Sequence, residues 1–170
     1  MEQRRPPAEH VLRAAIAYNR TDAARIHHLI KVTGFAQAIA ETEIADEDTR
    51  YTLEIAAILH DIGIHEAERK HGSSAGPYQE QEGPAVARSI LEPLGMPEEI
   101  IERVCWLIAH HHTVNPIGGP DHQILLEADF LVNAYEERLP RAAVEAFCRT
   151  VARTETGTEM IRGLYLSNES

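Results

Sequence analysis

Apolar residues recur every three or four positions along most of this chain. No stretch shows the alternation of apolar and polar residues that marks a half-buried strand. One helical stripe consists of His28, Val32, Phe35 and Ile39. The chain also has no Asn-Gly or Asp-Gly pair, the strongest short signal for a hairpin turn. These patterns predict an all-α fold.

Proline, glycine and capping residues divide the chain into the expected helices. We expect six to eight, near residues 9–19, 22–43, 46–60, 84–94, 121–138 and 140–166, the last span holding two, and one that begins at Pro97. A long irregular segment is expected at 66–81, where Gly, Ser and Pro cluster. Because 170 residues can bury one core but are too few for two ordinary enzyme domains, residues 1–170 are expected to form a single domain.

Charge and hydropathy restrict the partners of the chain. A formal net charge of −11 argues against a surface for long nucleic acids, which bind clustered Lys and Arg. No apolar run is long enough to span a membrane and the first residues lack a signal-peptide core, so we expect a cytoplasmic protein without a membrane partner. Cys105 and Cys148 lie in apolar helical patterns and are interpreted as reduced core residues. A homodimer is expected only from the general frequency of dimers.

Four side chains that can bind a metal stand where a helical pattern would place apolar ones: His28, His60, Asp61 and Asp129. A buried carboxylate costs several kcal/mol unless it has a partner, and a divalent cation is a suitable one. Adjacent side chains diverge on a regular helix, so His60 and Asp61 share a target only where a helix ends. Gly63 supplies such an end. A metal site built by these four residues is therefore our hypothesis.

Three segments resemble the motifs of the HD-domain metal-dependent phosphohydrolases. They are Arg25–Val32, in which a histidine precedes a valine by four residues, Ile58–Gly63 with the adjacent His and Asp, and Glu127–Leu131 with an Asp after an Ala. The likeness covers about residues 22–138. It implies an all-α HD fold in which His28, His60, Asp61 and Asp129 are the metal ligands.

The chain departs from the pattern of relatives that bind two metals. Many of these add a histidine just before the helix that is expected here to begin near Gly83, where this chain has no histidine in Tyr78–Gly83. Those relatives also carry one or two histidines on the next helix, and this chain has His110, His111 and His112 at that place. One divalent transition metal is therefore favoured, and Mn, Fe, Co, Ni and Zn all suit these ligands. A second metal is left open, with Glu80, His110 and His111 as its candidate ligands.

The resemblance implies hydrolysis of a small phosphate ester, such as a nucleotide, by a metal-activated water. Such a reaction needs a cation near the phosphate oxygens and a proton donor for the leaving group. Lys70 is the first candidate for the cation, with Lys31 and Arg69 behind it. For proton transfer His111 is preferred because its helical stripe points inward, and Glu66, His65 and His110 are the other candidates. A small phosphorylated compound is the expected partner.

The sequence is also compatible with two other functions. The HD fold also hosts di-iron oxygenases, although the missing histidine near Glu80 counts against two irons. A non-catalytic metal-containing module that binds a small molecule is the third alternative. A complete set of metal-binding residues does not by itself show that a protein catalyses a reaction. Common relatives carry a lysine directly after the HD-Ile-Gly stretch, where this chain has Ile64, so the pocket is expected to prefer a partly apolar ligand.

Overall fold

The computed structural model describes residues 5–167, and within them it contains nine α-helices, one short 3-10 helix and no strand. The helices are α1 (Ala8–Asn19), α2 (Ala23–Glu43), α3 (Glu47–Leu59), α4 (Ile64–His71), α5 (Gly76–Leu91), η1 (Glu92–Leu94), α6 (Glu98–Ile108), α7 (Pro120–Glu136), α8 (Arg141–Thr150) and α9 (Glu155–Tyr165). The predicted all-α fold is confirmed.

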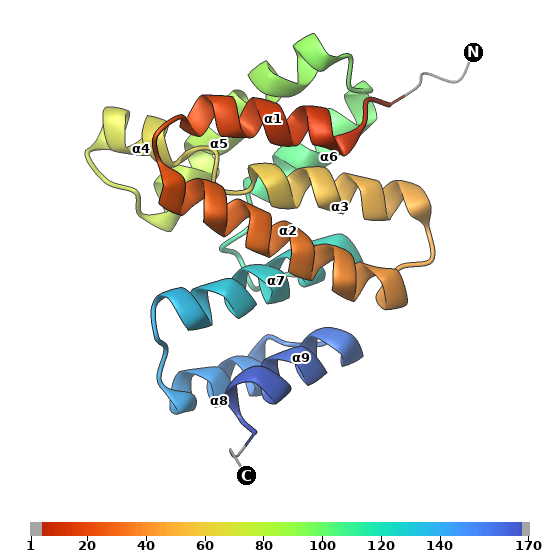
Figure 1. Cartoon of the computed structure of the whole chain (residues 1–170), viewed down its shortest axis with the longest axis vertical. Coiled ribbons are helices and arrows are strands. Elements are labelled where there is room, and N and C mark those ends of the chain that lie inside the picture. Colours follow the sequence, from red (N-terminus) through yellow and green to blue (C-terminus); the bar gives the residue numbers. More distant parts are fainter. Residues whose placement is uncertain (1–4, 168–170) are drawn as a thin grey trace.

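Helix α2 lies in the middle of the molecule, between α3 and α7 (Figure 1). On the far side of α3, α6 packs against α3 and α5, and α5 in turn packs against α4. The pair α8 and α9 lies beyond α7, at the end of the molecule opposite α1 (Figure 1). The side chains that can bind a metal therefore come from the central layers, and the C-terminal pair is set apart from most of these helices.

The helix start predicted from Asp22 as a capping residue is confirmed, and Asp46 caps the next helix in the same way. The Asp22 carboxylate accepts a hydrogen bond from the backbone N–H of Arg25 at 3.2 Å, and Asp46 accepts from that of Thr49 at 2.8 Å. Each bond satisfies one of the N–H groups that the first turn of a helix leaves free. The first turns of α2 and α3 are therefore fixed, and these helices carry His28 and His60 further along.

The segment 66–81 is mostly helical, which corrects the prediction of a long irregular loop. Helix α4 ends at Gly72, whose φ of 67° few other residues adopt, and only a short turn precedes α5. Pro77 occupies the first turn of α5, where its missing N–H costs no hydrogen bond. Pro84, which was expected to start this helix, lies inside it. The described residues therefore hold more helices than were expected.

Helix α7 is buried on nearly all sides, since every residue from 121 to 129 is buried. Four of these nine are apolar and five are polar or charged, and Glu127 has no exposed surface. Its carboxylate accepts hydrogen bonds from Gln123 Nε2 at 2.7 Å, from the backbone N–H of Arg153 at 2.7 Å and of Thr154 at 3.0 Å, and from the Thr154 hydroxyl. Glu127 thus ties the segment between α8 and α9 to the centre of the molecule.

None of the helices within residues 5–167 combines the length and the apolar character that crossing a membrane requires.

We expect Glu127→Ala to lower the free energy of unfolding by about 3 kcal/mol, because it leaves buried donors without an acceptor. Urea unfolding followed by circular dichroism measures the change. Glu137→Ala is the matched control, since Glu137 is exposed and close by in the chain. Equal stability of the two variants would contradict the role given to Glu127.

Candidate metal centre

Two ring nitrogens and two carboxylate oxygens converge in the interior, from α2, from the end of α3 and from α7. The Nε2 atom of His28, on α2, lies 3.2 Å from Nε2 of His60, 3.2 Å from Oδ1 of Asp129 and 3.4 Å from Oδ2 of Asp61. His60 Nε2 lies 3.5 Å from the same Asp129 oxygen. The structure thus brings together the four side chains that the sequence singled out as metal ligands.

The end of α3 turns His60 and Asp61 toward the same point. Backbone bonds from Ile62 N–H to the Leu59 carbonyl (3.0 Å) and from Ile64 N–H to the Asp61 carbonyl (3.1 Å) form the turn. Gly63 is required there, because a Cβ atom would lie 2.6 Å from the backbone nitrogen of Gly83 on α5. Helix α5 therefore packs directly against this turn and fixes its position.

Hydrogen bonds at Nδ1 set the proton position in three histidines. His28 Nδ1–H donates to Oε2 of Glu136 at 2.9 Å, His60 Nδ1–H to the Ala57 carbonyl at 2.8 Å, and His111 Nδ1–H to the Ile108 carbonyl at 2.6 Å. A neutral imidazole that donates from Nδ1 has a lone pair at Nε2. All three histidines therefore present Nε2 as a ligand atom, and acceptors of this kind are typical of histidines that bind metals.

The two carboxylates dominate the electrostatics of the cluster. Burial disfavours the charged form of both, but the neighbouring histidines outweigh it and hold the pKa of Asp61 and of Asp129 well below the usual range. Burial likewise opposes protonation of His60, yet Asp61 and Asp129 raise its pKa to about 9. The site therefore favours two negative charges: without a metal a proton at Nε2 of His60 balances one of them, and a bound cation would displace that proton.

A divalent cation fits this set of donors. Within the described residues, Nε2 of His111 is buried and has no hydrogen-bond partner, although it lies only 3.4 Å from Oδ1 of Asp61. Two groups have all their ligand atoms within 4.8 Å of one another: His28, His60 and Asp61, and Asp61, His111 and His112. Mixed imidazole and carboxylate ligands suit divalent transition metals. The cluster could therefore hold such a metal, with Asp61 shared between the two groups.

The other predicted ligands lie around this cluster in different roles. His110 turns away, since its Nδ1 donates to the Trp106 carbonyl at 2.7 Å and its ring stacks on Trp106. Glu80 accepts hydrogen bonds from the backbone N–H of His112 at 2.9 Å and from the Thr113 hydroxyl at 3.1 Å. Glu80 thus positions the loop that carries His112.

The candidates for phosphate binding and proton transfer on α4 contact one another and α5. Lys70 Nζ lies 2.6 Å from Glu82 Oε2 and 3.3 Å from Glu66 Oε1, and Arg69 also pairs with Glu66. Hydrogen bonds from Arg69 and Lys70 lower the pKa of Glu66 to about 2, which makes it a weak base. Among residues 5–167, no recorded hydrogen bond or ion pair joins Lys70 or Glu66 to the metal cluster.

Two residues of the site were not selected from the sequence. Arg25 Nη1 lies 4.0 Å from Oδ2 of Asp61, and its side chain is partly exposed. It stands three residues before His28, so the two share a helix face, and that spacing was a signal that could have found it. His112 belongs to the second group but was left unassigned, because adjacent side chains on a regular helix diverge. Helix α6 ends at Ile108, and the turn after it removes that restriction.

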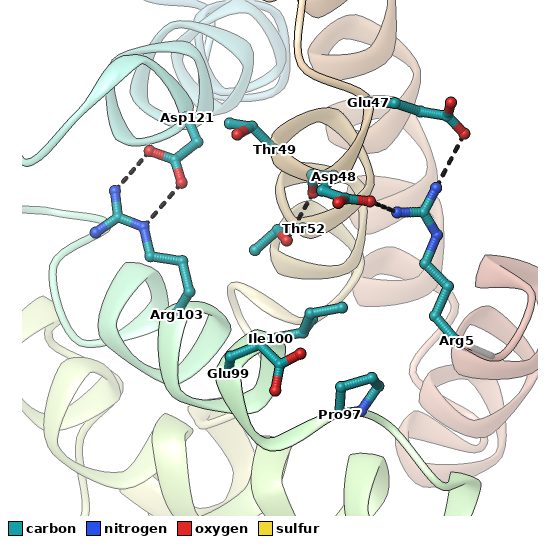
Figure 2. A pocket seen from close by; sticks show the side chains of 10 residues that line it. All are labelled: Arg5, Glu47, Asp48, Thr49, Thr52, Pro97, Glu99, Ile100, Arg103 and Asp121. Atoms are coloured by element: carbon teal, nitrogen blue, oxygen red, sulfur yellow. Dashed lines mark hydrogen bonds and ion pairs between the residues drawn. The ribbon is translucent and has the colours of Figure 1, made fainter. Parts of the chain in front are cut away.

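A cavity of about 860 Å³ lies away from this cluster (Figure 2). First turns of α3, α6 and α7 line it, and Figure 2 shows an arginine on each of two opposite sides. Arg103 binds Asp121 with two hydrogen bonds of 2.9 and 2.6 Å, and Arg5 pairs with Glu47 and Asp48. Both arginines of this cavity are thus paired with carboxylates, and none of the metal-ligand candidates lines it.

Comparisons with known proteins agree with this geometry. The family model of the HD domain matches residues 25–153. A crystal structure described as a predicted HD superfamily hydrolase from an uncultured Thermotogales bacterium is 26% identical, with a TM-score of 0.69. The match covers 97% of this chain and 88% of that one. The search of curated proteins found no match.

We expect Glu136→Ala to weaken metal binding about tenfold to 100-fold, because Glu136 orients His28 and makes its Nε2 a better ligand. Competition with a chelator of known affinity measures the metal dissociation constant. Glu136→Gln keeps an acceptor for His28 Nδ1–H and should lose less. If Glu136→Ala binds the metal as tightly as the unchanged protein, then Glu136 does not orient His28 as a metal ligand.

Proposed function

Because the chain belongs to the HD domain family, we propose that it is a metal-dependent phosphohydrolase that acts on a small phosphate ester, such as a nucleotide. The observation that supports this most is the convergence of three Nε2 atoms and two carboxylates in the interior, with Arg25 beside them. The carboxylates of the cluster need a cation to balance their charge. The same cation and a guanidinium can together offset the negative charge of a phosphate ester. A hydrolase of this class accounts for all of these groups together.

In this proposal His28, His60, Asp61 and Asp129 hold the metal. When bound, a divalent cation supplies Lewis-acid chemistry, since it polarises a phosphoryl oxygen and lowers the pKa of water. The protein contributes the fixed orientation of these ligands and excludes bulk water, because His28 and His60 are buried and Asp129 is 8% exposed. Nearby partial and full charges act more strongly in such an interior than they do in water.

We assign the contact with the phosphate oxygens to Arg25 rather than to Lys70. Arg25 lies at the edge of the cluster and is partly exposed, so its guanidinium can contact a substrate and Asp61 from the same position. A guanidinium matches two phosphate oxygens at once. Lys70, in contrast, is held by Glu82 and Glu66. Its charge is thus already balanced by carboxylates.

Proton transfer to the leaving group falls to the loop after α6. His111 is the buried member, and its Nε2 points toward Asp61. His112 lies next to it, with ring centroids 3.9 Å apart, and is the more exposed of the two. Burial, the largest effect, and neighbouring His111 lower the pKa of His112, so at neutral pH it is a base rather than an acid. In a one-metal site His111 can take up a proton at its unpartnered Nε2 and pass it to the leaving group.

One observation favours a second function, an HD-type di-iron oxygenase. His112 supplies a ligand atom beside Asp61 and His111, although the histidine expected before α5 is absent. Both metals of a two-metal centre would then share Asp61. Elemental analysis of protein purified without added metal separates the two functions, because two irons per chain favour the oxygenase and a single transition metal favours the phosphohydrolase.

The proposal predicts release of phosphate from at least one member of a panel of phosphate monoesters, diesters and nucleotides with Mn²⁺, Co²⁺ or Ni²⁺. Phosphate release measured by colour formation tests it. Asp61→Ala should lose metal and activity together, since Asp61 belongs to both ligand groups. No release from any compound by the metal-loaded protein would reject the phosphohydrolase and leave the oxygenase or a non-catalytic binding module.

Arg25→Gln should lower kcat/KM for the best substrate about tenfold to 100-fold, the cost of losing one charged hydrogen bond. The metal content should stay at the level of the unchanged protein, because Arg25 is not a ligand. Steady-state kinetics and elemental analysis measure the two quantities. Lys70→Gln is the matched comparison, and a larger loss with Lys70→Gln would return the phosphate contact to Lys70.

A further inference from the structure

A second cavity, of about 640 Å³, lies on the C-terminal helix pair and is of a different kind from the one in Figure 2. Arg141, Glu145, Cys148 and Arg149 of α8 line it, together with Arg162 of α9 and the residues that follow α9. None of these belongs to the metal cluster. In Figure 1 this helix pair forms one end of the molecule, on the far side of α7 from α3.

The charge of this cavity is opposite to that of the whole chain. The protein carries a formal net charge of −11, yet three arginines and one glutamate line the cavity. Arg141 Nε binds Glu145 Oε1 at 3.0 Å, so this pair is neutral. Across residues 5–167, Arg149 and Arg162 form no recorded ion pair with a carboxylate. Two positive charges of the cavity therefore remain unbalanced within the described part of the chain.

Helix chemistry accounts for only part of this arrangement. Arg149 lies in the last turn of α8 and Arg162 in the last turn of α9, where a cation interacts favourably with the helix dipole. That effect requires only that each arginine be near its own helix end. It does not require both to line one cavity. The arginines of the larger cavity, Arg5 and Arg103, are each neutralised by carboxylates.

We propose that the cavity lined by Arg149 and Arg162 is a binding site for a small phosphate-bearing anion, separate from the metal centre. Guanidinium groups bind phosphate oxygens in pairs, and Ser167 adds a hydroxyl to the lining. The volume of about 640 Å³ is in the range of small-molecule sites and exceeds what a phosphate alone needs. The expected ligand is thus free phosphate or the phosphate group of a small organic compound.

Cys148 provides a reporter inside this site. Its thiol lines the cavity and is partly exposed, and it lies near enough to Arg162 for that cation to act on it. An anion held by the arginines covers the thiol and slows its reaction with a neutral alkylating reagent. The second cysteine, Cys105, contacts the Pro84 carbonyl on α5 and is removed by Cys105→Ala for the measurement.

The test follows alkylation of Cys148 by iodoacetamide in the Cys105→Ala protein, by intact mass, with inorganic phosphate added at constant ionic strength. Phosphate at ten times its dissociation constant should slow alkylation about tenfold. Arg149→Gln combined with Arg162→Gln should abolish this protection, whereas Arg13→Gln, an exposed arginine on α1, should leave it intact. Circular dichroism verifies that each variant is folded.

Further arms separate the alternatives. Protection that persists in Asp61→Ala places the anion away from the metal centre, whether or not the protein is a phosphohydrolase. Ribose 5-phosphate that protects at lower concentration than phosphate identifies an organic phosphate as the ligand, and equal protection identifies phosphate itself. The proposal is overturned if phosphate gives no protection, if chloride protects equally, or if the double arginine variant is protected as well as the parent.

Discussion

Two carboxylates surrounded by three histidines define the centre of this protein. His28, His60 and His111 each donate the Nδ1 proton to a carbonyl or a carboxylate outside the cluster, so that Nε2 faces Asp61 or Asp129. The two carboxylates repel each other unless a positive charge, either a proton or a metal ion, lies among these atoms. The burial of the cluster, the ends of the helices around it and the position of Arg25 all take their meaning from that requirement.

The helices around the cluster hold it by different means. Helix α2 is capped at its start and positions His28 by regular helix geometry. The turn at the C-terminal end of α3 positions His60 and Asp61, and α7 positions Asp129 from a segment that is buried on nearly all sides. Glu127 anchors α7 to the chain between α8 and α9 through buried hydrogen bonds. The C-terminal pair therefore supports the centre although it carries none of the candidate ligands.

The sequence predicted much of this because the relevant signals are local. Helical spacing identified the fold, Asp22 identified a helix start, and the His60-Asp61 pair before Gly63 identified a helix end that carries two candidate ligands. The position of α5 could not be predicted in this way. The contact of Gly83 with Gly63 joins residues far apart in sequence, and Pro84 inside the helix resembles a local helix start. The approach of His112 to Asp61 and the bonds of Glu80 to the loop after α6 are also long-range contacts, which local patterns do not reveal.

The backbones of Gly63 and Gly83 touch so closely that neither position has room for a side chain. A Cβ atom on Gly63 would meet the backbone of Gly83, and one on Gly83 would lie 2.5 Å from a methyl group of Ile108 at the end of α6. The ligand turn and α5 are thus in backbone-to-backbone contact, and α5 meets the end of α6 through the side chain of Ile108. Because closely packed interiors transmit strain, we expect a displacement of one of these segments to shift the others. Two glycines, which bind nothing themselves, would in this way limit how far the centre can deform.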